Sequence, residues 1–147
     1  MSRKRTTLMM MCSRHETATP FSWPVAAADI LFAGFLRGQN LKDAFKSADI
    51  FVMPSVSEPF GLVALEAVAS GTPAIISKQS GVSESLSHVL KVDFWDIDEM
   101  TDQMVSILRN PALHKTLSVE GQAESHRNTW SKAATETIKV YRKTINK

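Results

Sequence analysis

Residues 49–77 read DIFVMPSVSEPFGLVALEAVASGTPAIIS, and this stretch decides the fold. Short apolar runs at 49–54 and 74–77 flank a longer apolar segment at 60–70. Short runs without polar alternation are typical of parallel strands that are covered on both faces, and the longer segment has the length of a helix. Strand, helix and strand therefore follow one another, which predicts the α/β fold class with a Rossmann-like parallel sheet.

The same alternation continues on both sides of this stretch. Further apolar runs predict strands at 30–35 and 89–92. The segments between the strands predict helices at 39–48, 81–87 and 98–109. The chain from residue 30 onward therefore has the element order of a Rossmann-like domain whose end is helical.

The last third of the chain is predicted to be helical. Asn110 followed by Pro111 indicates a helix start, with Asn as the cap and Pro in the first turn. Ala134, Ile138 and Tyr141 lie on one stripe of a final helix, and we expect this stripe to dock on the domain with part of it left exposed. A solvated face is the ordinary interpretation of the basic residues beside it, and contact with a membrane surface is the alternative. These basic residues are Lys139, Arg142, Lys143 and Lys147.

Residues 1–29 show no sustained period, because basic residues, consecutive methionines and two prolines interrupt any pattern. We predict a lead-in at 1–29 and a partial domain at 30–147. Residues 6–11 are the only candidate for a strand within the lead-in.

Composition bounds the class of protein. The chain has 147 residues, of which 44% are hydrophobic, and these values are typical of one globular domain. A formal net charge of +2 gives no electrostatic reason to expect a nucleic-acid partner. Cys12 is the only cysteine, which fits a reducing compartment such as the cytoplasm. No metal site is expected, because the four histidines are isolated from one another and from other ligands.

The segment between the first two strands of this stretch carries the candidate chemistry. Glu58 lies in a loop, a helix begins near Phe60 and Gly61, and Glu66 lies inside that helix. The N-terminus of a helix offers free N–H groups and the positive end of its dipole, which suits a phosphate. Gly61 leaves room for a ligand to approach the backbone. The pattern therefore suits a sugar nucleotide held between two carboxylates.

The plainer interpretation is that both carboxylates are solvated surface charges. Glu66 argues against it, because it interrupts the apolar run between Leu62 and Ala69. A carboxylate on so apolar a helix is expected to have a partner or a ligand, since unpaired burial is costly.

The sequence EPFGLVALE at 58–66 resembles the Glu-x7-Glu signature of retaining GT-B glycosyltransferases, and of glycosyltransferase family 4 in particular. The flanking residues agree with the same family over roughly 30–143 of the chain. They include GFL at 34–36, ADIFVMPS at 48–55, GTPAI at 71–75, the Ser80-Gly81-x-x-Glu84 turn, and Trp130 before the last helix.

The resemblance implies a role for each matching residue. Glu58 matches the Glu that contacts hydroxyls of the transferred sugar, and it is the catalytic residue implied. Glu66 matches the Glu that binds the ribose. The donor is a nucleotide diphosphate sugar, and the family generally needs no metal or cofactor. The remaining matches are Phe60, Gly61, Leu62 and Val63 for backbone contacts to sugar and diphosphate; Leu36, Arg37 and Gly38 for main chain facing the base; and Gly81 and Glu84 for a turn bordering the site. A second interpretation of Glu84 is a carboxylate at a helix start.

The chain also departs from the family pattern. Family members have an N-terminal acceptor-binding domain and two further strand–helix units that carry an Arg and a Lys for the diphosphate, and nothing in 1–29 resembles them. We therefore expect a fragment that transfers no sugar alone. In the doubly wound order the two missing strands would lie between 30–35 and 49–54. We expect either a replacement strand from the first 29 residues there or direct contact between the two.

Two alternatives to an enzyme part remain open from the residues alone. One is a non-catalytic module that binds sugar nucleotides or another protein. The other is an inert product of a truncated reading frame.

Overall fold

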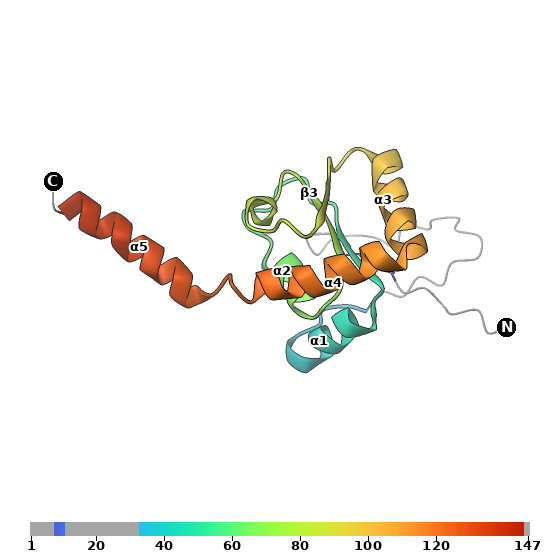
Figure 1. The fold of residues 1–147 in the computed structure, drawn as a ribbon, viewed down its shortest axis with the longest axis horizontal. Coiled ribbons are helices and arrows are strands. Elements are labelled where there is room, and N and C mark those ends of the chain that lie inside the picture. Colours follow the sequence, from blue (N-terminus) through green and yellow to red (C-terminus); the bar gives the residue numbers. More distant parts are fainter. Residues whose placement is uncertain (1–7, 11–32, 146–147) are drawn as a thin grey trace.

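The computed structural model describes residues 8–10 and 33–145. Its centre is a four-stranded parallel sheet with the strand order β1-β2-β3-β4 (Figure 1). The predicted α/β class and the strands expected at 49–54, 74–77 and 89–92 are confirmed. The strands are β1 (Leu8–Met10), β2 (Ile50–Met53), β3 (Ala74–Ser77) and β4 (Leu90–Val92).

Helices follow the strands, as the apolar pattern predicts. The helices expected at 39–48, 60–70 and 98–109 are confirmed, and so is the helix start at Asn110. The segment 81–87, which was expected to be a helix, contains only a short 3-10 turn that ends at Glu84. The helical elements are α1 (Gly38–Ser47), α2 (Leu62–Ala69), η1 (Gly81–Glu84), α3 (Ile97–Arg109), α4 (Pro111–Ser125) and α5 (Trp130–Ile145).

Every residue of β2 and β3 is buried, so both faces of the sheet are covered. Because successive side chains of a strand point to opposite faces, β2 contributes to two separate core clusters. Phe51 packs with α1, α2 and the segment after β3, and Ile50 packs with α3 and α4. Burial on both faces explains why these strands lack polar alternation in the sequence.

A strand from the first 29 residues lies beside β2. This confirms the first of the two expectations, a replacement strand at this position. In β1, Leu8 lies opposite Ile50 and Met10 opposite Val52, and the two strands are parallel. The strand expected at 30–35 is not confirmed. Residues 33–35 are not extended in the sheet, and 30–32 lie outside the described residues. The physical reason is Gly34, whose φ of 66° turns the chain and leaves Phe35 80% exposed.

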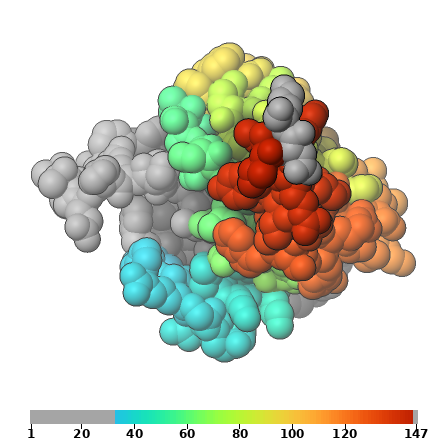
Figure 2. Space-filling model, turned by 90° about the vertical axis from the view of Figure 1, so that its left-hand side faces the viewer, coloured from blue at the N-terminus to red at the C-terminus, as the bar shows by residue number. Residues whose placement is uncertain are grey.

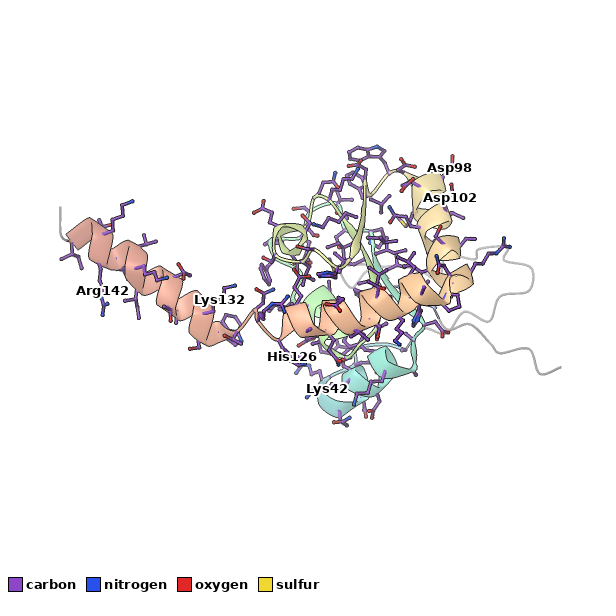
Figure 3. The ribbon with its side chains drawn as sticks, in the orientation of Figure 1. Lys42, Asp98, Asp102, His126, Lys132 and Arg142 are labelled. Carbon is purple, nitrogen blue, oxygen red and sulfur yellow. The ribbon has the colours of Figure 1, made fainter. Side chains whose placement is uncertain are left out.

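The expectation that the last helix docks on the domain is wrong. No residue of α5 is buried, and the helix extends away from the body of the molecule (Figure 1). Figure 2, viewed from the side to which α5 points, shows it in front of the body. Tyr141 is 65% exposed and Ile145 80%. Figure 3 places Lys132 and Arg142 on α5, far from Asp98 and Asp102 on α3.

No helix within 33–145 is long and apolar enough to cross a membrane.

Candidate functional site

The loop between β2 and α2 leads directly to an open helix start. Gly61 has a φ of 98°, a left-handed conformation that favours glycine. A Cβ at this position would lie 3.0 Å from both Met53 Cε and Val82 Cγ1. Gly61 therefore makes a sharp turn possible where no side chain fits, and α2 begins at Leu62. This is slightly later than the sequence pattern indicates.

The start of α2 has no side-chain cap. The first amides of a helix have no partner within the helix, and at α2 no described side chain accepts from them. The start of α1 is also uncapped, whereas Asp96 caps α3 and Asn110 caps α4. Since α2 follows β2 directly, its start lies at the carboxyl edge of the sheet, where open α/β sheets bind ligands. The Leu62 and Val63 N–H groups are therefore free to bind an anion.

The turn η1 supports the loop that carries Glu58. The Gly81 N–H donates to the Glu58 carbonyl at 3.1 Å, and the Val82 N–H donates to the Phe60 carbonyl at 2.5 Å. A Cβ on Gly81 would collide with the Pro59 carbonyl oxygen, so only glycine permits this approach. Gly81 and Glu58 thus lie side by side, and the predicted place of Gly81 at the border of the site stays a prediction.

Glu84 is exposed and lies in the first turn of η1, which is only four residues long. The second interpretation of Glu84, as a carboxylate at a helix start, therefore stays open. No hydrogen bond to its carboxylate forms within 33–145, and its predicted place at the border of the site stays a prediction.

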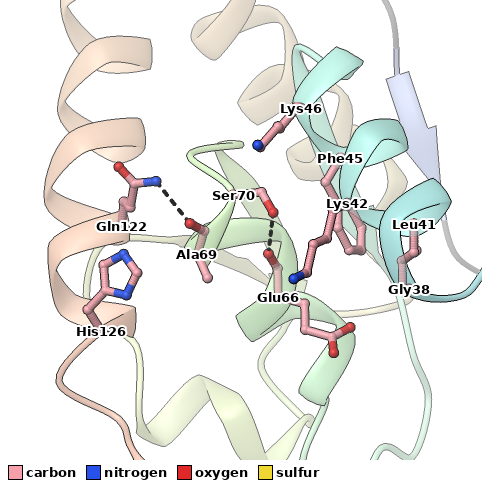
Figure 4. A pocket seen from close by; sticks show the side chains of 10 residues that line it. All are labelled: Gly38, Leu41, Lys42, Phe45, Lys46, Glu66, Ala69, Ser70, Gln122 and His126. Atoms are coloured by element: carbon pink, nitrogen blue, oxygen red, sulfur yellow. Dashed lines mark hydrogen bonds between the residues drawn. The ribbon is translucent and has the colours of Figure 1, made fainter.

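A cleft of about 460 Å³ opens beside Glu66, between α1, α2 and the end of α4 (Figure 4). Gly38 and Glu66 both line it, so the cleft joins the segment expected to face the base with the carboxylate expected to bind ribose. Glu58 is not part of this cleft. The other lining residues are Leu41, Lys42, Phe45, Lys46, Ala69, Ser70, Gln122 and His126.

Glu66 is exposed, so the expectation that burial forces a partner on it is wrong. Ala64, Ala67 and Val68 of α2 are apolar because they face the core, while Glu66 lines the cleft. Within the described residues its carboxylate forms no hydrogen bond or ion pair, although its backbone carbonyl accepts from Ser70 Oγ at 2.9 Å. The carboxylate is therefore free to accept hydrogen bonds from a ligand.

Sequence reasoning missed three charged or titratable side chains in the cleft. Lys42 and Lys46 line it from α1, and His126 reaches it from the end of α4 (Figure 4). Lys42 follows Gly38 by one helical turn, so the helical period was a usable signal for it. His126 lies sixty residues from Glu66 along the chain, and only the tertiary packing of α4 brings it there.

The side chains of the segment before α1 lie outside the cleft. The Arg37 guanidinium lies 4.5 Å from the centre of the Phe35 ring, a cation–π contact on the exposed side of the molecule. Leu36 is half-buried. Neither side chain lines the cleft, so a role for this segment rests on its main chain, with Gly38 as the nearest point.

Beyond η1, a polar cluster fixes the carboxyl ends of β3 and β4. Asp93 accepts hydrogen bonds from Lys78 Nζ and Gln79 Nε2, each at 2.8 Å. The hydrogen bonds from Lys78 and then Gln79 lower the pKa of Asp93, and the hydrogen bond to Asp93 raises the pKa of Lys78. This cluster is solvent-exposed, so its contribution to stability is small.

Within the described part of the chain no three histidine, cysteine or acidic side chains gather in a way that would hold a metal ion.

The fold and the sequence both match known glycosyltransferases. The family described as "Family 4 Glycosyltransferase in conflict systems" matches residues 37–147. An uncharacterized glycosyltransferase of Methanocaldococcus jannaschii is 34% identical over 118 residues, which are 77% of this chain and 30% of that protein. Mannosylfructose-phosphate synthase of Agrobacterium fabrum is 31% identical, with 74% of this chain and 25% of that protein covered.

Two solved structures identify the class of protein to which the fold belongs. The C-terminal domain of a glycosyl transferase group 1 family protein from Francisella tularensis has a TM-score of 0.59 at 25% identity, covering 66% of this chain and 52% of that one. Sucrose-phosphate synthase from Thermosynechococcus elongatus also has a TM-score of 0.59, at 32% identity, covering 70% of this chain and 27% of that one. The fold is therefore that of the C-terminal domain of GT-B glycosyltransferases. The chain belongs to glycosyltransferase family 4. It spans less than a third of the length of these curated relatives.

Proposed function

We propose that this chain is the donor-binding part of a retaining glycosyltransferase and binds a nucleotide diphosphate sugar. The diphosphate lies at the start of α2, the ribose at Glu66 and the transferred sugar near Glu58. The observation that carries the proposal is the uncapped start of α2, which lies between these two carboxylates along the chain and one helical turn before Glu66, a lining residue of the cleft. Free amides and the helix dipole both favour a phosphate at that point.

The cleft beside Glu66 suits the nucleoside end of the donor. A ribose offers two vicinal hydroxyls, and a free carboxylate accepts a hydrogen bond from each. Lys42 and His126 line the same cleft and add donors that the sequence alone did not indicate. The base then lies toward Gly38, where the start of α1 has no side-chain cap.

Glu58 suits the other end of the donor. Its carbonyl is fixed by the Gly81 N–H, and its side chain is half-buried beside Gly61. A carboxylate held there accepts hydrogen bonds from sugar hydroxyls and stabilises the positive charge that develops on the sugar during transfer. Glu58 is therefore the residue to which we assign catalysis.

We further propose that the chain alone binds donor without transferring sugar. Transfer requires groups that position the acceptor and stabilise the leaving diphosphate. The described residues supply the donor side only. Measured transfer of sugar from any sugar nucleotide by the purified chain, lost in Glu58→Ala, would contradict this.

Titration calorimetry tests whether Glu66 binds the ribose and Glu58 binds the transferred sugar. The probes are uridine, adenosine and guanosine diphosphates and their glucose conjugates. With the base that binds, Glu66→Gln is expected to weaken both ligands by about 1.5–3 kcal/mol, the range for hydrogen bonds to charged groups. Glu58→Gln is expected to weaken mainly the sugar nucleotide.

Glu120→Gln, an exposed carboxylate on α4, is the matched control and should leave both affinities unchanged. Equal losses for both ligands in Glu66→Gln and Glu58→Gln would show that the carboxylates do not divide the ligand. Absence of binding by the unaltered chain to every probe would overturn the proposal.

A further inference from the structure

The carboxylate of Glu124 is fixed at the end of α4 by an unusual number of donors. It accepts from the backbone N–H groups of Ser87 and His88, each at 2.9 Å, and from His88 Nδ1 at 3.0 Å. Its side chain is only 13% exposed. Burial on its own raises the pKa of Glu124, but the hydrogen bonds from His88 and Ser87 outweigh it and lower the pKa to about 2.

Two further contacts attach the same segment to α4 and to the residues just after it. Asn128 Nδ2 donates to the Ser85 carbonyl at 3.2 Å. At Gly121 a Cβ would lie 3.2 Å from the His88 carbonyl oxygen, so glycine allows the helix and this segment to approach closely. Residues 85–88 are therefore held at several points on one side.

Residues 80–86 form one tightly hydrogen-bonded unit. The Ser83 N–H donates to the Ser80 carbonyl at 3.0 Å, and the Leu86 N–H donates to the Val82 carbonyl at 3.1 Å. Val82 and Leu86 are both buried in the core cluster that also contains α2. A displacement at 85–88 is therefore transmitted to η1 rather than absorbed by a flexible loop.

On its other side this unit holds the loop of Glu58 through the Gly81 and Val82 amides. We infer that Glu124 is a positioning residue that sets the place of Glu58, acting through residues 85–88 and η1, and so determines how well the site holds the sugar end of its donor. The inference rests on the proposed function for its ligand. The effect of Glu124 on η1 and on the loop of Glu58, however, concerns this chain alone and needs no ligand. A merely structural role for Glu124 makes a different prediction, because loss of stability affects all ligands of the folded chain alike.

The binding test compares Glu124→Gln with Glu120→Gln, which lies one turn earlier on the same helix. In Glu124→Gln, affinity for the sugar nucleotide is expected to fall about 3- to 30-fold, the range for changes along a coupled network. Affinity for the matching nucleoside diphosphate should fall less, since Glu66 forms no hydrogen bond with residues 80–88 within the described part of the chain, although the start of α2 packs against Val82. Equal losses for the two ligands, or no loss, would overturn the inference. Asn128→Ala, which removes one contact only, should give a smaller loss in the same direction, and it serves if Glu124→Gln does not fold.

Amide hydrogen exchange tests, without a ligand, whether Glu124 holds η1 in place. In Glu124→Gln the Gly81 and Val82 amides should exchange faster, while the Ile75 and Ile76 amides of β3 stay unchanged. Faster exchange confined to Ser87 and His88 would show that Glu124 stabilises only these two residues, and it would overturn the inference. If the unaltered chain binds none of the probes, the proposed function fails, and the exchange result alone decides the role of Glu124.

Discussion

The helices α4 and α5 are neighbours of nearly equal length, with 15 and 16 residues, yet only one of them packs on the domain. The final helix α5 has the more regular apolar stripe, but none of its residues is buried. By contrast α4 buries Leu117, Gly121 and Ser125. An amphipathic pattern states that a helix has a face to bury, and only a complementary surface decides whether it is buried.

Polar side chains make the difference at α4. Ser118 Oγ donates to the Gly71 carbonyl at 2.6 Å, and Gln122 Nε2 donates to the Ala69 carbonyl at 2.9 Å. His114 Nε2 lies 3.2 Å from the Asp49 carbonyl. The contacts of Ser118 and Gln122 satisfy carbonyl groups at and just after the end of α2, and His114 adds a contact at the start of β2. The helix α5 makes no such contact with the body in the described part of the chain.

The largest effect is expected from truncating the buried face of α4. Leu117 is 6% exposed and packs in the core cluster with Ile107 and Val52. Leu117→Ala should lower the free energy of unfolding by about 2–4 kcal/mol, through lost burial and the cavity left behind. Urea unfolding measures it. A loss below about 1 kcal/mol would mean that α4 is held by its polar contacts alone.

A smaller and pH-dependent effect is expected at Glu124. Its pKa is lowered from the ordinary value of 4.5 to about 2, so its ionised form stabilises the folded chain. This contribution is fully present above pH 4.5 and is lost as the pH falls through about 2. Glu124→Gln should cost about 2–3 kcal/mol at pH 7, and the difference from the unaltered chain should shrink toward pH 2. A difference that does not vary with pH would show that the charge of Glu124 is unimportant.

The smallest effect is expected on α5. Ile138 is 47% exposed and Tyr141 65%, so Ile138→Ala and Tyr141→Ala remove little buried surface. Each should change the free energy of unfolding by less than about 0.5 kcal/mol, as is usual for surface positions. The same urea experiment as for Leu117→Ala gives the comparison. A loss above about 1 kcal/mol would show that α5 packs on the domain in solution.

Local rules predicted most of the fold from the sequence. The run at 49–54 and the Asn110-Pro111 pair are decided by neighbouring residues, and both were assigned correctly. The failures at 30–35 and in α5 have one cause in common. In both cases an apolar run or stripe predicts burial in the core. The described part of the domain has no complementary surface that covers residues 33–35 or α5.

The candidate site was predicted less completely. The relation of Glu58, Gly61 and Glu66 to the start of α2 follows from spacing along one segment. Glu66 was expected to be buried because its neighbours are apolar, but the helix turns it toward solvent. The packing of α4 against distant segments brings His126 to the cleft and Glu124 to residues 87–88, and no local pattern records either contact.

Amide chemical-shift mapping tests the central claim most directly, namely that a donor diphosphate binds at the start of α2 beside Glu66. Uridine, adenosine and guanosine diphosphates are each titrated into the unaltered chain. With at least one of them, the account predicts saturable shifts at Leu62 and Val63 and around Gly38, and none in α5. Shifts confined to α5, or no saturable shift at the start of α2 with any diphosphate, would contradict it.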